Sequence, residues 1–173
     1  NISLNPGRIG FLQVLEAMGA RVSGEVTGAI LGDPVGTVAV RGAGLRGTSV
    51  SGALAAASLD ELPLVAIVAS YAEGITTVAD AAELKVKESD RIAATVELVN
   101  ALGGGAQAYP DGFEVVGLGW LDGGTVDSGG DHRIAMAAAV AATGALGPVT
   151  IEGAAAAAVS WPRFYEALEA LWS

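Results

Sequence analysis

The stretch Thr95-Val-Glu-Leu-Val-Asn-Ala-Leu-Gly103 decides the fold, because a similar phrase occurs three times along the chain. The other two copies read Phe11-Leu-Gln-Val-Leu-Glu-Ala-Met-Gly19 and Phe164-Tyr-Glu-Ala-Leu-Glu-Ala-Leu-Trp172. Each copy places its apolar residues on one stripe of a helix, and the first two end in Gly, which suits a left-handed C-terminal cap. The recurrence predicts an architecture built from internal repeats.

Two strand-like segments follow each of the first two helices. They cover residues 20–31 and 36–41 after the first helix, and residues 106–109 and 113–117 after the second. A turn is predicted within the second pair, at Pro110-Asp-Gly112. Each helix is therefore expected to lead into a pair of strands.

A second phrase, an apolar helix that leads into a short strand, occurs at residues 62–79 and again at 132–151. Asp60 precedes the first copy and Asp131 the second, 71 residues later. This spacing indicates a unit of about seventy residues with the order helix, strand, helix, strand, strand. The chain then holds one full unit between two incomplete ones, which predicts an α/β fold made of repeated units.

The start of the chain bears on its domain organisation. Asn1 is neither a start methionine nor the beginning of a signal pattern, so we expect the chain to be part of a longer protein. No linker-like run of Ser, Pro and Gly divides the sequence. Residues 1–173 are therefore predicted to form a single domain that is incomplete at its N-terminal side.

The composition restricts the partners and the class of protein. Hydrophobic residues make up 51% of the 173 residues, enough for a well-filled globular core. The net charge of −10 argues against a nucleic acid or an anionic membrane as the general partner. Because the chain has no cysteine, it has no disulfide, thiolate zinc site or thiol nucleophile, and we expect a cytoplasmic location.

The mean hydropathy of +0.50 raises the question of a membrane span. The longest apolar stretches are residues 62–72, which contain Pro63 and Ser70, and residues 134–149, which are interrupted by Thr, Gly and Pro. A spanning helix needs ~20 consecutive apolar residues. These short helices are therefore predicted to lie in the protein core, and no membrane partner is expected.

Basic residues gather at two predicted helix starts. The four residues concerned, of nine in the chain, are Lys85, Lys87, Arg91 and Arg133. Ser89 or Asp90 can cap the first helix and Asp131 the second. A helix start favours an anion, and an Arg in the first turn adds a bidentate donor for carboxylate or phosphate. Two such starts in equivalent repeat positions can converge on one small anion.

Each of these residues can also be interpreted as having a purely structural role. The charged run around Lys87 can be a solvated helix entrance, where surface ion pairs contribute little to stability. His132 alone would be a capping or surface residue, and Asp60 alone an N-cap residue. The pattern becomes specific only when all of these residues are considered together.

Considered together, they resemble the bacterial 5-enolpyruvylshikimate-3-phosphate (EPSP) synthases from end to end of the chain. The segments that carry the resemblance are Asp80-Ala-Ala-Glu-Leu-Lys-Val-Lys-Glu-Ser-Asp-Arg-Ile92, Val126-Asp-Ser-Gly-Gly-Asp-His-Arg-Ile-Ala-Met136, Val159-Ser-Trp-Pro-Arg-Phe164, Asn5-Pro-Gly-Arg-Ile-Gly-Phe11 and Leu59-Asp-Glu-Leu-Pro63.

The resemblance implies a fold and a reaction. Members of this family have two similar domains, each made of three β-α-β-α-β-β units with buried helices under outer sheets, and the active site lies between the domains. They transfer the enolpyruvyl group of phosphoenolpyruvate to the 5-hydroxyl of shikimate 3-phosphate and release phosphate. The resemblance implies no metal and no organic cofactor. The expected partners are these two substrates and the N-terminal domain of the same protein.

By matching positions, the resemblance also implies roles for six residues. Asp60 would be the general base near the attacking hydroxyl, and Glu88 would handle the proton at the methylene carbon of phosphoenolpyruvate. Arg91 and Arg133 would bind the carboxylate and phosphate of that substrate. The remaining two substrate-binding residues would be Lys87, which reaches the phosphorylated shikimate, and His132.

The sequence departs from the family pattern at several points. Some members carry Lys at the position of Val159 and Asn at the position of Glu83. The Lys-Ser and Ser-Ser-Gln segments that bind substrates from the other domain have no counterpart, so we expect a half-site that is inactive alone. Two alternatives stay open: a UDP-N-acetylglucosamine enolpyruvyl transferase, and a non-enzymatic repeat domain for anion binding or assembly.

Overall fold

The computed structural model describes residues 2–42 and 44–171 of the chain. The strands are β1 (Ile2–Ser3), β2 (Arg21–Ile30), β3 (Asp33–Arg41), β4 (Ser49–Val50), β5 (Gly74–Val78), β6 (Gly105–Tyr109), β7 (Gly112–Gly117), β8 (Gly124–Asp127) and β9 (Val149–Glu152). The α-helices are α1 (Gly10–Ala17), α2 (Gly52–Ala57), α3 (Leu62–Ser70), α4 (Arg91–Ala101), α5 (His132–Ala142) and α6 (Phe164–Glu169). The 3-10 helices are η1 (Leu59–Glu61), η2 (Ala82–Val86) and η3 (Ala154–Val159).

The pairing of the strands confirms the repeated α/β architecture. The central sheet has the order β4-β5-β7-β6, in which β4 and β5 are parallel and the other neighbours antiparallel. The sheet β1-β3-β2 has the same order and directions as β5-β7-β6, and the parallel pair β8-β9 corresponds to β4-β5. One complete β-α-β-α-β-β unit thus lies between two partial ones in the described residues.

Some local features differ from the sequence predictions. The short first strands of the units, β4 and β8, were not predicted, because two to four residues are too few to show an alternating pattern. Residues 154–159, expected to be a loop of small residues, form the 3-10 helix η3. The last predicted helix ends at Glu169, and its predicted final residue, Trp172, lies outside the described residues.

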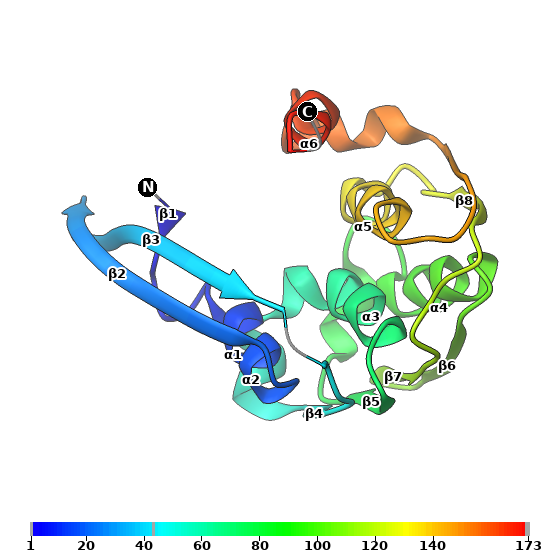
Figure 1. The fold of residues 1–173 in the computed structure, drawn as a ribbon, viewed down its shortest axis with the longest axis horizontal. Helices are drawn as coiled ribbons and strands as arrows, with labels where there is room; N and C mark the ends of the chain where they lie inside the picture. The colour runs from blue at the N-terminus through cyan, green and yellow to red at the C-terminus, as the bar shows by residue number, and fades with distance from the viewer. Residues whose placement is uncertain (1, 43, 172–173) are drawn as a thin grey trace.

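The apolar helices form the core, as their composition predicts. Seven of the nine residues of α3 are buried, which explains why this helix is apolar on all sides. Figure 1 shows α3 and α4 on one side of the central sheet, with α5 next to them. The helices α3, α4 and α5 pack on one another, so their N-terminal ends can be held in fixed relative positions.

The β2–β3 hairpin is the least buried part of the fold. It extends away from the body of the molecule (Figure 1), and nine of the ten residues of β2 are exposed. Its counterpart in the complete unit, the β6–β7 hairpin, instead pairs with β5 and packs beneath α3 and α4. The hairpin therefore contributes little to the core that carries the site.

Candidate functional site

Capping interactions at the helix starts place the charged residues. Asp90 caps α4 and accepts hydrogen bonds from the backbone N–H groups of Ile92 and Ala93, at 3.1 Å each. Asp131 caps α5 and accepts from the backbone N–H of Arg133 at 2.8 Å. Arg91, His132 and Arg133 thus stand in the first turn of two neighbouring helices, as predicted.

A close approach between α1 and the end of α2 brings a further arginine to the site. A Cβ atom on Gly10 would lie 2.6 Å from Ser58 Oγ and 2.7 Å from the backbone of Ala57, so only glycine permits this contact. The loop before α1 then places Arg8 Nη2 3.6 Å from Asp60 Oδ2. Arg8 is a member of this cluster that was not predicted from the sequence.

Arg91 is the centre of the cluster and is almost fully buried, with 1% of its side chain exposed. Its Nη1 lies 3.3 Å from Asp60 Oδ1, and its Nη2 donates to Glu88 Oε2 at 2.5 Å. Its Nε donates to Asp131 Oδ2 at 2.9 Å. Three segments of the chain therefore converge on one guanidinium group.

Asp60 lies between three arginines. Besides its contact with Arg91, its Oδ2 atom is 3.5 Å from Arg133 Nη2 and 3.6 Å from Arg8 Nη2. Positive charge from three different segments of the chain therefore gathers around this one carboxylate. The cluster joins four of the six predicted site residues, namely Asp60, Glu88, Arg91 and Arg133.

Arg133 has one donor without an acceptor. Its Nη1 pairs with Oε1 of Glu61 at 3.3 Å, and Glu61 was not predicted as a site residue. Its Nε is buried and has no hydrogen-bond partner among the described residues. Buried donors in proteins nearly always have a partner, so this Nε–H marks a position suited to an oxygen atom of a bound anion.

Two of the carboxyl groups around the arginines, those of Glu61 and Asp131, have pKa values shifted in opposite directions. Burial raises the pKa of Glu61, and Arg133 offsets this only in part. Burial also acts to raise the pKa of Asp131, but hydrogen bonds from Arg91, Arg133 and Ser89 outweigh it, so that the pKa lies below its ordinary value. Asp131 is therefore ionised at neutral pH despite its burial.

The two remaining predicted residues lie at the edge of the cluster. Lys87 Nζ pairs with Glu83 Oε1 at 2.7 Å, and both line a polar pocket of about 220 Å³ together with Arg8 and Asp60. The His132 side chain is half-buried at the start of α5 and makes no hydrogen bond or ion pair with the part of the chain that the structure describes. The structure thus gathers Lys87 near Asp60 but assigns His132 no partner.

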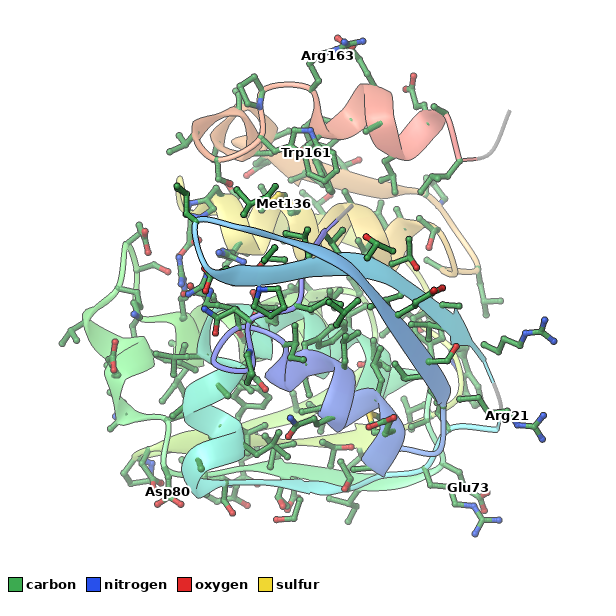
Figure 2. All side chains as sticks on the ribbon, turned by 90° about the vertical axis from the view of Figure 1, so that its left-hand side faces the viewer. Arg21, Glu73, Asp80, Met136, Trp161 and Arg163 are labelled. Atoms are coloured by element: carbon green, nitrogen blue, oxygen red, sulfur yellow. The ribbon has the colours of Figure 1, made fainter. Side chains whose placement is uncertain are left out.

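An apolar groove adjoins the charged cluster. It has a volume of about 230 Å³, with Asp60, Glu61 and Arg133 at its polar end. Figure 2 shows Trp161 close to Met136 of α5, and both line the groove. Arg163 points away from it in the same view and pairs with Glu166 at 2.7 Å, so it does not replace the lysine that some family members carry at Val159.

Two negative findings concern the described residues, 2–42 and 44–171. No three or more His, Cys, Asp or Glu side chains form a group able to hold a metal ion. None of their helices has the length and apolar character needed to cross a membrane.

Comparisons with known proteins agree on one family. The sequence model for EPSP synthase (3-phosphoshikimate 1-carboxyvinyltransferase) matches residues 1–168. The 3-phosphoshikimate 1-carboxyvinyltransferase of Synechococcus sp. (strain JA-3-3Ab) is 46% identical to this chain over 171 residues, which is 99% of this chain and 38% of that protein. The protein of the same name from Herpetosiphon aurantiacus is 47% identical over 165 residues, again 38% of its length.

A solved structure supports the same relationship. The EPSP synthase of Acinetobacter baumannii superposes with a TM-score of 0.92 at 34% sequence identity. The match covers 97% of this chain and 40% of that structure. The chain therefore spans about two fifths of the length of the proteins that it resembles.

Proposed function

The chain belongs to the EPSP synthase family, and from this premise we propose that it is part of a longer enzyme that transfers the enolpyruvyl group of phosphoenolpyruvate to the 5-hydroxyl of shikimate 3-phosphate. The reaction releases phosphate and passes through a tetrahedral intermediate. The proposal includes the partners and location predicted from the sequence, namely both substrates, an N-terminal domain of the same protein, and the cytoplasm. Residues 1–173 would be one incomplete C-terminal domain.

The observation that carries the proposal is the arginine cluster with its unfilled donor. Phosphoenolpyruvate brings a carboxylate and a phosphate into one site, and fixed guanidinium groups offset the repulsion between such anions. Arg91 and Arg133 stand on either side of Asp60, and the Nε–H of Arg133 lacks an acceptor among the described residues. An anion at this place would complete the hydrogen bonding of Arg133.

The proposed proton transfers use the two more exposed carboxylates that contact Arg91, namely Glu88 and Asp60. In the addition step, Glu88 gives a proton to the methylene carbon while the 5-hydroxyl oxygen bonds to the neighbouring carbon and Asp60 takes the hydroxyl proton. In the elimination step, Glu88 takes a proton back from the methyl carbon and phosphate leaves. Glu88 is 52% exposed, and within the described residues its ion pair is with Arg91 alone, so it can move toward a substrate.

Lys87 and His132 complete the proposed site with smaller roles. Lys87 shares its polar pocket with Arg8 and Asp60, which suits an ammonium that reaches a phosphorylated substrate once Glu83 releases it. His132 follows Asp131 and precedes Arg133, and its ring has no hydrogen-bond partner within the described residues, which suits a hydrogen bond to the same anion.

The proposal is tested with the full-length enzyme that contains this chain, because the chain alone would hold only half of the site. Purified enzyme is incubated with phosphoenolpyruvate and either shikimate 3-phosphate or UDP-N-acetylglucosamine, and released phosphate is measured. We expect turnover with shikimate 3-phosphate only. Turnover with the nucleotide sugar alone would favour the rival transferase, and turnover with neither would favour a non-enzymatic repeat domain.

A variant pair localises the activity to this cluster. Arg133→Ala removes a charged donor worth ~1.5 to 3 kcal/mol, and we expect kcat/KM for phosphoenolpyruvate to fall at least ~10-fold. Arg163→Ala is the matched control, because Arg163 is exposed, pairs with Glu166 and points away from the groove. Equal kcat/KM values in both variants would contradict the assignment of Arg133.

A further inference from the structure

Asp131 does more than the N-cap role that its position predicts. Its carboxylate accepts four hydrogen bonds: from the Arg133 backbone N–H at 2.8 Å, from Ser89 Oγ at 2.8 Å, and from Arg91 Nε at 2.9 Å and Nη2 at 3.4 Å. Its side chain is fully buried. Capping α5 requires only the first of these bonds.

The two bonds to Arg91 fix the plane of the guanidinium group. Asp131 occupies the edge formed by Nε and Nη2, and bidentate contacts of this kind set orientation as well as strength. The remaining N–H groups then point to the other side, where Asp60 and Glu88 lie. This is the side on which a substrate anion would meet Arg91.

Asp131 also joins the two arginines through one rigid group. It holds the Arg91 side chain and the Arg133 backbone at once, although these residues belong to different helices. Asp60, which stands 71 residues earlier in the equivalent place of the repeat, contacts the same guanidinium but is 25% exposed. A substrate anion can displace the partly exposed carboxylate of Asp60 from Arg91, whereas it cannot displace the buried carboxylate of Asp131.

We propose that Asp131 is a positioning residue for the enolpyruvyl transfer site: it orients Arg91 toward the substrate anion and fixes Arg91 relative to the start of α5. That the anion which meets Arg91 is a substrate rests on the proposed function, whereas the orientation of Arg91 is a property of this chain alone. The two parts are therefore tested separately.

Charge alone and positioning of Arg91 predict opposite effects of Asp131→Asn on the binding of an anion. Asp131→Asn removes a negative charge beside Arg91, and on charge alone this change strengthens the attraction for an anion. The same variant keeps the cap, since Asn caps as well as Asp, but it can no longer accept from both Nε and Nη2. If positioning dominates, anion binding weakens despite the added positive charge.

The matched control is Asp90→Asn. Asp90 caps α4 just as Asp131 caps α5, and Asp90→Asn makes the same change of charge. Within the described residues, however, the side chain of Asp90 accepts hydrogen bonds from the backbone N–H groups of Ile92 and Ala93 and from no arginine. Ser89→Ala is a second, milder variant, because it removes one donor to Asp131 and leaves both charges in place. It keeps the proposal testable if Asp131→Asn does not fold.

The first measurement is hydrogen exchange of the Arg91 Nε–H in the 15N-labelled 173-residue chain, followed by NMR. We expect slow exchange in the parent chain and in Asp90→Asn, faster exchange in Ser89→Ala, and loss of the protected signal in Asp131→Asn. An Nε–H that exchanges at the parent rate in both Ser89→Ala and Asp131→Asn would overturn the proposal.

The second measurement is kinetic and uses the full-length enzyme. We expect Asp131→Asn to lower kcat/KM for phosphoenolpyruvate by about 100-fold, the scale of a misplaced catalytic group, and Asp90→Asn to leave it unchanged. An unchanged or raised kcat/KM in Asp131→Asn would overturn the proposal. If the parent enzyme shows no transfer at all while the NMR result holds, the proposed function fails and the orientation of Arg91 by Asp131 stands.

Discussion

Three arginines and four carboxylates share one small volume at the starts of α3, α4 and α5. The arginines are Arg8, Arg91 and Arg133, and the carboxylates are Asp60, Glu61, Glu88 and Asp131. In this state the carboxylates occupy the donors of Arg91, whereas the Nε–H of Arg133 has no acceptor among the described residues. An anion that binds Arg91 must therefore displace the more exposed of them, and Glu88 is the most exposed of the carboxylates that contact Arg91.

The sequence predicted the members of this cluster better than their pairing. Asp60, Glu88, Arg91 and Arg133 were identified by resemblance, and the structure brings all four together. Arg8 and Glu61 lay inside quoted segments without a role, because only the packing of α1 on α2 and of α3 beside α5 makes them neighbours of the site. Asp131 was recognised as a cap, but its bond to Arg91 spans 40 residues and has no local signal.

Asp131 should make the stability of the fold sensitive to acid. Its native pKa lies below the ordinary value of 3.8, so between those two pKa values the unfolded chain takes up a proton that the native chain does not. The stability due to Asp131 is thus complete above about pH 4 and is lost as the pH falls through the native pKa. We expect the urea midpoint of Asp131→Asn to lie below that of the parent chain at pH 6.

This difference between the two midpoints should shrink at pH 3, where the parent chain has begun to lose the contribution of the carboxylate because the pH is below the ordinary pKa of 3.8. Asp90→Asn, measured in parallel, corrects for the loss of a capping charge that has no arginine partner. A difference between the parent chain and Asp131→Asn that stays constant from pH 6 to pH 3 would contradict the lowered pKa.

At the scale of elements, the repeated phrase predicted the helices because 3.6-residue periodicity is strong over nine residues. The helices α1, α4 and α6 all begin within the predicted phrases or just before them. The strands β4 and β8 open their units and were missed, since their positions are set by parallel pairing with β5 and β9 rather than by local pattern. Pairing of this kind becomes visible only in the assembled sheet.

Gly10 provides a test of how the elements position the site. A methyl group there would meet Ser58 and the backbone of Ala57 at less than 3 Å, so Gly10→Ala must push α1 away from α2. We expect a loss of ~1 to 3 kcal/mol in the free energy of unfolding, the usual cost of overpacking. Urea unfolding measures this loss.

Gly42→Ala is the matched control for Gly10→Ala, because a Cβ on Gly42 meets no atom within 4 Å among the described residues other than its chain neighbours. It should unfold at nearly the same urea concentration as the parent chain. A Gly10→Ala variant that is as stable as Gly42→Ala would show that α1 and α2 have room between them.

At the scale of the whole molecule, the buried core favours folding of the single chain, whereas the exposed edge of a sheet favours its association with other chains. The helices α3, α4 and α5 find their apolar partners within the described residues, so we expect the chain to fold alone. The ten-residue strand β2, however, stands at the end of its sheet among the described strands and has exposed apolar side chains, and such edge strands pair with other chains. Folding and self-association should therefore occur together.

Sedimentation of two lysine variants tests whether the chains associate through the edge of β2. Val26 lies on β2 with 62% of its surface exposed, and Val26→Lys should lower the degree of association, because charged residues on an edge strand oppose pairing. Val86→Lys is the control, since Val86 is 79% exposed but lies in η2, outside any strand. Equal association of the two variants, or an unfolded chain by circular dichroism, would contradict this account.

The central claim is that this chain supplies the proton-transfer and anion-binding half of an enolpyruvyl transfer site. Glu88 tests it most directly, because Glu88→Gln keeps the size of the side chain but cannot exchange a proton. The measurement is solvent-deuterium incorporation into the methylene group of phosphoenolpyruvate by the full-length enzyme with shikimate 3-phosphate. We predict incorporation by the parent enzyme and a fall of at least ~100-fold in Glu88→Gln, the scale of general acid–base catalysis. Equal incorporation by the two enzymes would contradict the claim.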